Sequence, residues 1–218
     1  LLERAVPGIS LRSHFPNREQ ESIEIACNVM KRLHQANIPA AHNFPHIKDP
    51  GYAEASWLAA LDKDWSIPDA YLKKARKLRD QLLKTADANV LLHGDLHHDN
   101  ILQKGDDWVV IDPKGVIGEP AYEVAAFIRN PPTLLAELRR TSPNEPLSTI
   151  ALAKVENIIH NRITRFAEAL ELPSQRILDW CFLQAVLAWI WALEDGCDAS
   201  YFEQLTKVFN KMHHHDKQ

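Results

Sequence analysis

The sequence predicts a mainly helical protein of the α+β class, with one small β-hairpin near the middle of the chain. Long stretches on both sides of residues 90–115 repeat their apolar residues at helical spacing. Two short β-prone runs, Ile101-Leu102 and Trp108–Ile111, flank a turn at Lys104–Asp107, which is the pattern of a hairpin. The 218 residues suffice for one sizeable core.

Two amphipathic helices are predicted before the hairpin. Asn17 is a candidate N-cap, and Gln20 follows three residues later, as in a capping box. Apolar residues then recur on one face until Asn37 and Pro39 end the first helix. A loop is predicted over residues 40–51, a short helix over residues 52–61 and the second long helix from Pro68 onward.

The chain is predicted to be helical again past Pro120, with apolar stripes over residues 152–170, 180–194 and 202–212. The second stripe carries Trp180, Trp189 and Trp191, which we interpret as core side chains, with a ligand-stacking site as the alternative. His160 and Arg162 are expected on a solvated face. We expect His213–His215 to form a solvated tail, with metal binding or a purification-tag remnant as alternatives.

The composition is that of an ordinary globular protein, with 45% hydrophobic residues, 25% charged residues and a net charge of -4. This charge does not favour nucleic acid or an anionic membrane as a partner. Cys27, Cys181 and Cys197 form no C-x-x-C pair, so we expect buried thiols in a reducing cytoplasm. Residues 180–193 fall short of the roughly 20 that span a bilayer and predict a core helix.

The chemically distinctive segment runs from His93 to Asn100 and has the skeleton H-x-D-x-x-x-x-N, followed by the hairpin and Asp112. Phosphoryl transfer needs a carboxylate beside the acceptor hydroxyl, and Asp95 fits that role. Mg²⁺ prefers oxygen ligands, which Asn100 and Asp112 can supply once the hairpin brings them together. We interpret His93 as a scaffold residue that holds the loop.

Two other interpretations of this segment remain open. It could be a polar loop that caps a helix. It could also be a zinc hydrolase site, because imidazole and carboxylate ligands alternate at His93, Asp95, His97, His98 and Asp99. The zinc interpretation gives no role to Asn100 before the hairpin or to Asp112 after it.

The motif His-Gly-Asp-Leu-His-x-x-Asn-Ile-Leu, followed by Ile-Asp-Pro-Lys, resembles the aminoglycoside-phosphotransferase and choline-kinase superfamily. Residues 118–131, Gly-Glu-Pro-Ala-Tyr-Glu-Val-Ala-Ala-Phe-Ile-Arg-Asn-Pro, are similar to the streptomycin 6-kinase and hydroxyurea phosphotransferase branch. The resemblance implies a protein-kinase-like C-terminal lobe over residues 1–218. Within it would lie a hinge at 1–8, the catalytic loop and metal-site hairpin at 90–115, and a helical subdomain at 120–212.

The resemblance also implies an activity, phosphoryl transfer from ATP with Mg²⁺ to a hydroxyl of a small molecule. Streptomycin is the first acceptor it suggests, and hydroxyurea is the alternative. The roles carried over are Asp95 as catalytic base, Asn100 and Asp112 as magnesium ligands, His97, Glu123 and Arg129 near the acceptor, and Leu2, Arg4, Leu102 and Ile111 near the nucleotide.

The resemblance starts at the family's hinge, whereas family members carry a β-rich N-terminal lobe with a lysine that pairs the ATP phosphates. We therefore expect that lobe to be absent and activity to be impaired, because a positioned cationic contact is worth orders of magnitude in rate. The alternative from another class is a non-catalytic remnant that binds the small molecule. Self-association through the face left by the missing lobe is a further expectation.

Overall fold

The computed structural model describes residues 3–14, 17–49, 59–86, 89–130 and 149–215. Its strands are β1 Pro7–Ser10, β2 Val90–Leu92, β3 Ile101–Lys104, β4 Asp107–Val110 and β5 Val116–Gly118. Its α-helices are α1 Glu19–His34, α3 Asp69–Lys84, α4 Pro120–Arg129, α6 Thr149–Leu170, α7 Ser174–Glu194 and α8 Ser200–His215. Two 3-10 turns, η1 Leu11–His14 and η2 His98–Asn100, complete the set. The predicted mainly helical α+β class is confirmed.

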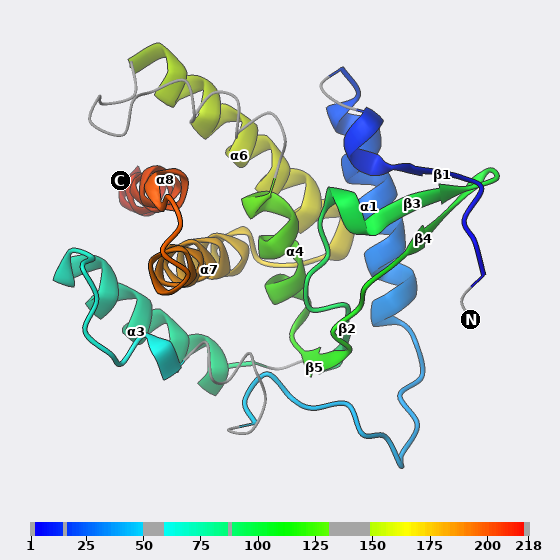
Figure 1. Ribbon diagram of the computed structural model, residues 1–218, viewed down its shortest axis with the longest axis horizontal. Helices are drawn as coiled ribbons and strands as arrows, with labels where there is room; N and C mark the ends of the chain where they lie inside the picture. The colour runs from blue at the N-terminus through cyan, green and yellow to red at the C-terminus, as the bar shows by residue number, and fades with distance from the viewer. Residues whose placement is uncertain (1–2, 15–16, 50–58, 87–88, 131–148, 216–218) are drawn as a thin grey trace.

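The helices α3, α4, α6, α7 and α8 gather on one side, and α1 packs beside the sheet of β1, β3 and β4 on the other (Figure 1). Helix α7 is the centre of the helical side, where α3, α4, α6 and α8 all contact it. The loop that joins β2 to β3 runs between the two sides. The segment with the distinctive sequence therefore lies at the junction of the molecule.

The predicted hairpin is present and belongs to a larger sheet. β3 and β4 pair antiparallel, with Ile101 opposite Val110 and Lys104 opposite Asp107. β1, which begins inside the predicted hinge at 1–8, adds to the other edge of β3. β2 and β5 form a second, two-stranded sheet. These extra strands are three or four residues long, too short for an alternation pattern to reveal them.

Helix α7 is the core of the helical side, as its composition predicts. Every residue from Ile177 to Ile190 is buried, which is typical of a helix that is apolar on all faces. By length and hydropathy α7 could cross a membrane, but 83% of its most apolar window is buried inside the fold. Trp180 and Trp189 are core side chains, as predicted, whereas Trp191 is only half-buried.

Several local predictions were wrong, each because a tertiary contact decides the outcome. Arg18, and not Asn17, occupies the N-cap position of α1, and no side chain caps that end. Arg162 is fully buried and pairs with Glu19 of α1 instead of facing solvent. His213 is also buried within α8 and bonds Asp179 of α7 at 2.9 Å, so this part of the predicted tail is helical. The short helix predicted over residues 52–61 lies mostly outside the described residues.

Candidate active site

His93 ties the loop to the end of the hairpin. Its buried ring donates from Nε2 to the carbonyl of Ile111 at 2.8 Å and accepts at Nδ1 from the amide of Asp95 at 3.3 Å. Burial lowers the pKa of His93, which keeps the ring neutral and suits one donor and one acceptor nitrogen. The predicted scaffold role is confirmed. One imidazole thus fixes Asp95 relative to the residue that precedes Asp112.

Glu123 of α4 anchors the same loop from behind. Its carboxylate is fully buried and accepts from the amide of His93 at 2.6 Å and from that of Gly94 at 3.1 Å. Burial raises the pKa of Glu123 to about 7, although these amide donors favour its ionised form. Nε2 of His34 lies 4.0 Å away, and burial lowers the pKa of His34 to about 4. Glu123 was predicted near the acceptor, and the structure instead places it under the loop backbone.

Gly94 is required where the loop crosses the strand that follows the hairpin. Its φ is +88°, a conformation that glycine adopts without steric cost. A Cβ atom here would lie 3.0 Å from Cβ of Lys114 and 3.1 Å from Cγ1 of Val116. The close approach lets Lys114 donate its amide to the carbonyl of His93 at 2.7 Å. The loop and the segment after Asp112 are therefore locked together.

The two predicted metal ligands lie at neighbouring ends of the hairpin. The amide of Ile111 donates to the carbonyl of Asn100 at 3.0 Å, so Asp112 follows directly after the residue that pairs with Asn100. The Asn100 side chain donates from Nδ2 to the carbonyl of Asp95 at 2.9 Å, so its oxygen is the atom left to face a ligand. Asp112 has a φ of +56°, and its side chain is 71% exposed. A non-glycine residue held in the left-handed region is a feature of functional sites.

Two further polar residues of the loop, His98 and Asp99, have partners elsewhere in the fold. Asp99 forms an ion pair with Arg12 of η1, which holds the pKa of Asp99 below its usual range. His98 is buried and stacks on Phe127 at 4.0 Å between ring centroids. Among the described residues, no three His, Cys, Asp or Glu side chains are grouped to hold a metal ion. The separate partners of His93, His98 and Asp99 argue against the zinc interpretation.

Asp95 and His97 face a pocket of about 360 Å³ between the loop, α4 and α7. The side chains and backbone that line it belong to Gly94, Asp95, His97, Tyr122, Arg129, Asn130, Gln184, Leu187 and Trp191. Nε2 of His97 lies 3.9 Å from the Asp95 carboxylate, and burial lowers the pKa of His97. Asp95 is therefore the acidic side chain of this pocket.

The far wall of the pocket comes from α7, which sequence reasoning assigned to the core. Trp191 lies under the guanidinium of Arg129, with 5.8 Å from Cζ to the ring centroid. Gln184 is buried and donates to the carbonyl of Tyr122 at 2.8 Å. The signal that could have found this wall is Gln184 itself, a polar residue that interrupts an otherwise apolar helix.

The predicted nucleotide residues lie on or near the three-stranded sheet. Leu102 is a half-buried residue of β3 opposite Val109, and Ile111 follows β4 with 40% of its surface exposed. Arg4 is exposed ahead of β1, and Leu2 lies outside the described residues. Leu102, Ile111 and Arg4 are not among the residues that line the Asp95 pocket.

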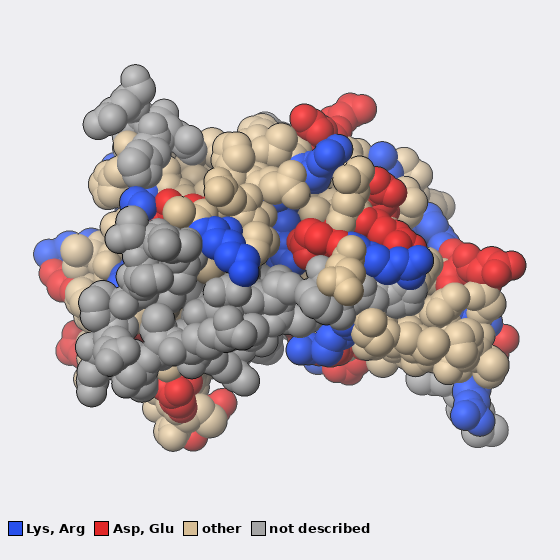
Figure 2. All heavy atoms as spheres, turned by 90° about the horizontal axis from the view of Figure 1, so that it is seen from above, with Lys and Arg blue, Asp and Glu red and all other residues tan. Residues whose placement is uncertain are grey.

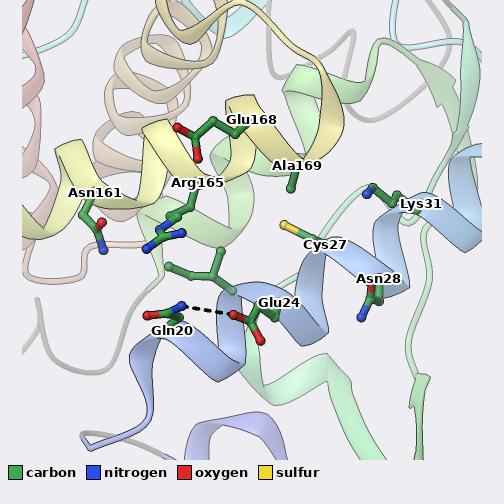
Figure 3. Close-up of a pocket in the computed structure, with 10 residues that line it drawn as sticks. Gln20, Glu24, Cys27, Asn28, Lys31, Asn161, Arg165, Glu168 and Ala169 are labelled. Atoms are coloured by element: carbon green, nitrogen blue, oxygen red, sulfur yellow. Dashed lines mark hydrogen bonds between the residues drawn. The ribbon is translucent and has the colours of Figure 1, made fainter.

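A second pocket of about 410 Å³ lies in a groove between α1 and α6, and the residues that line it come from these two helices (Figure 3). Cys27 lines its base, and burial raises the pKa of that thiol to about 11. Glu24, Lys31, Arg165 and Glu168 line its exposed sides. On the face in Figure 2, too, acidic and basic side chains are interspersed instead of gathered by sign, as the small net charge predicts.

Comparison with known proteins identifies the family. The model of the family described as aminoglycoside/hydroxyurea antibiotic resistance kinase matches residues 1–196. The chain belongs to this kinase family. The streptomycin 3''-kinase of Klebsiella pneumoniae is 27% identical over 214 residues, which are 97% of this chain and 73% of that protein. The predicted resemblance is confirmed.

Solved structures agree with the fold. Choline kinase LicA from Streptococcus pneumoniae superposes with a TM-score of 0.61 at 13% identity, over 96% of this chain and 69% of that one. A thermostable mutant of aminoglycoside phosphotransferase APH(4)-Ia, in ternary complex with ADP and hygromycin B, gives a TM-score of 0.60 at 15% identity, over 93% and 68%. The fold is that of the aminoglycoside phosphotransferases and choline kinases.

Proposed function

We propose that this chain transfers the γ-phosphoryl group of ATP, with Mg²⁺, to a hydroxyl group of a small molecule. The observation that carries the proposal is the His93 bridge, which fixes the Asp95 amide to the hairpin end beside Asp112. The bridge therefore fixes the position of the Asp95 carboxylate, which faces a pocket, relative to the oxygen ligands Asn100 and Asp112. Because phosphoryl transfer depends on positioning and charge stabilisation, this arrangement fits the reaction.

Asp95 would orient the acceptor and take its proton. The acceptor oxygen forms a bond to the γ-phosphorus, the bond between that phosphorus and the bridging oxygen of ADP breaks, and the hydroxyl proton passes to the Asp95 carboxylate. His97, 3.9 Å from Asp95 and neutral, would hold the acceptor hydroxyl in line. Glu123 and His93 act only through the backbone of the loop and are positioning residues.

The donor set fits magnesium. Asn100 offers a neutral oxygen and Asp112 an exposed carboxylate, and a hard cation prefers such oxygen ligands. The left-handed backbone of Asp112 supports this role, since it aims a side chain out of the hairpin at a steric cost. When bound, Mg²⁺ would neutralise phosphate charge during transfer. Leu102, Ile111 and Arg4 would contact the nucleotide; ADP is bound in the APH(4)-Ia complex.

A streptomycin-like aminoglycoside is the first acceptor to test, because a streptomycin kinase is among the relatives. Hydroxyurea is the second, because the description of the family includes it. The competing function is binding of the small molecule without turnover.

Val6 and Ile9 of the β1 region are 64% and 43% exposed, which supports a further proposal of self-association through this face. Light scattering across a concentration series tests it.

Nucleotide titration tests the proposal. ATP with Mg²⁺ is titrated by calorimetry into the parent chain, into Asp112→Ala and into the control Asp106→Ala, which changes an exposed residue in the turn of the same hairpin. We expect binding to the parent and the control and none to Asp112→Ala. ADP release with streptomycin or hydroxyurea then measures turnover. Equal nucleotide binding to the parent and to Asp112→Ala would overturn the metal site. Nucleotide binding without turnover on any acceptor would favour the non-catalytic function.

A further inference from the structure

Lys114 brings a positive charge to the proposed metal site. Its Nζ lies 3.3 Å from Oδ2 of Asp112, and the two side chains are 36% and 71% exposed. An ion pair that is this open to water contributes little to stability. The position of Lys114 is therefore better explained by what its ammonium group can bind than by what it adds to the fold.

The fold fixes the start of this side chain against the loop that carries Asp95. The Lys114 amide donates to the carbonyl of His93 at 2.7 Å, and a Cβ atom on Gly94 would lie 3.0 Å from Cβ and 3.4 Å from Cγ of Lys114. Burial lowers the pKa of His93 most, and the charges of Asp95 and Lys114 act on the same ring in opposite directions. The side chain of Lys114 therefore runs from the loop beside Asp95 to the carboxylate of Asp112.

An anion that lies between these two carboxylates needs a cationic partner. In the proposed reaction the γ-phosphoryl group passes from the nucleotide, at the Asp112 end, to a hydroxyl group beside Asp95. Its negative charge there meets a carboxylate at each end of its path, and like charges repel. A lysine ammonium carries three donors on a flexible stem and is a common phosphate ligand. When Asp112 coordinates a metal ion, its oxygen is no longer available to Lys114, whose ammonium group can then donate to a phosphate oxygen.

We propose that Lys114 is a phosphate-binding residue of the transfer reaction. Before the nucleotide binds, its ammonium group neutralises the Asp112 carboxylate. In the complex it donates to an oxygen of the γ-phosphoryl group, the group that is transferred. The proposal rests on the proposed function, in that the nucleotide lies at the Asp112 end of the site. It deepens that function by assigning the positive side chain that holds the γ-phosphoryl group between two carboxylates.

Two nucleotides that differ by one phosphoryl group test the proposal. AMP-PNP keeps the γ-phosphoryl group and is not turned over, whereas ADP lacks that group. The affinity for each is measured by calorimetry with Mg²⁺ on the parent, Lys114→Met and Lys114→Arg. The matched control is Lys104→Met, because Lys104 lies in β3 of the same hairpin, is 39% exposed and pairs with the carboxylate of Glu3 at 2.7 Å.

The parent and Lys104→Met should bind AMP-PNP more tightly than ADP. Lys114→Met should lower the affinity for AMP-PNP by about tenfold or more, because a charged donor to the γ-phosphoryl group is lost, and that for ADP by less than about threefold. Lys114→Arg retains the charge and should retain most of the preference. If Lys114 only positioned Asp112, its loss would weaken both nucleotides alike, since both bind with the metal ion. An unchanged ratio of the two affinities in Lys114→Met would therefore overturn the proposal.

Tripolyphosphate with Mg²⁺, titrated into the same four chains, separates this proposal from the proposed function. If no nucleotide binds but tripolyphosphate binds at least tenfold more weakly to Lys114→Met than to the parent, the phosphate contact stands in a chain that is not a kinase. If nucleotide binds and turns over with the same ratio in Lys114→Met, the proposed function stands and Lys114 is not a phosphate ligand. Binding of neither nucleotide nor tripolyphosphate to the parent would overturn both.

Discussion

The Asp95 pocket and the groove between α1 and α6 are similar in size and both are lined by charged side chains, but they differ in how those charges are held. In the groove, Glu24, Lys31, Arg165 and Glu168 are exposed on the outer sides of two helices. In the Asp95 pocket, Arg129 is buried, and the loop that carries Asp95 is held by Glu123 beneath it. Fixed and desolvated charge, and not cavity volume, distinguishes a site from a surface depression.

The largest expected effect is on turnover. Asp95→Asn removes the carboxylate that would accept the proton while it keeps the side-chain shape. We expect kcat to fall by about 10²- to 10⁴-fold with little change in the affinity for ATP. Steady-state kinetics and nucleotide calorimetry together measure this. A fall in kcat of less than threefold would mean that the Asp95 pocket is no more a catalytic site than the groove.

Glu123→Gln tests the support beneath the loop. The pKa of Glu123, about 7 when folded, exceeds its ordinary 4.5, so the folded chain binds more protons between these values. The unfolding free energy of the parent should therefore fall relative to that of Glu123→Gln as pH rises from about 4.5 to 7, by on the order of 2–3 kcal/mol. The neighbouring His34 changes stability in the opposite direction between pH 4 and 6.5, but it is present in both chains.

The same variant should lose activity even where it gains stability. The glutamine NH₂ group would face an amide donor of His93 or Gly94, so the loop must shift, with an expected loss of about 10- to 100-fold in kcat. Chemical denaturation at pH 5 and 7.5 and a kcat profile over the same range provide the measurements. A pH-independent stability difference would contradict the burial argument.

Asp112→Gly separates function from stability at the hairpin end. Glycine adopts the +56° φ without steric cost, which offsets its greater loss of chain entropy. We expect Mg²⁺-dependent nucleotide binding to disappear while the unfolding free energy stays equal or rises by up to about 1 kcal/mol. Urea denaturation with calorimetry checks both. A clear loss of stability would indicate that Asp112 has a structural role instead.

The groove should give the smallest effects. Glu24→Gln and Arg165→Met change exposed residues that line it, so the unfolding free energy should change by less than about 0.5 kcal/mol. Turnover and nucleotide affinity should match those of the parent. A tenfold change in either quantity would mean that the groove is coupled to the site, and the comparison would fail.

Sequence reasoning located the loop and the hairpin because their signals are local. His93, Asp95 and Asn100 lie within eight residues, and the hairpin that returns Asp112 is a short-range turn. It interpreted Trp191 as a core side chain, with a ligand-stacking site only as the alternative, since only the packing of α7 on α4 brings that residue to the loop.

The burial of Glu123, Arg162 and His213 was missed for a similar reason. A short stretch of sequence around each polar residue predicts exposure, and only hydrogen bonds or ion pairs from distant parts of the chain make burial tolerable: the loop amides for Glu123, α1 for Arg162 and α7 for His213.

Helix α8 has a consequence for how the chain acquires its structure during synthesis. Lys74 of α3 donates to Asn210, Lys211 pairs with Glu156 of α6, and His213 bonds Asp179 of α7, so α8 links three helices made before it. A ribosome releases these partners in chain order, so the part of α7 that contacts α8 is made before its cover. Until α8 is made, the surface that it covers on α7 stays open to association with other chains, which is the kind of exposed apolar surface that favours aggregation during synthesis.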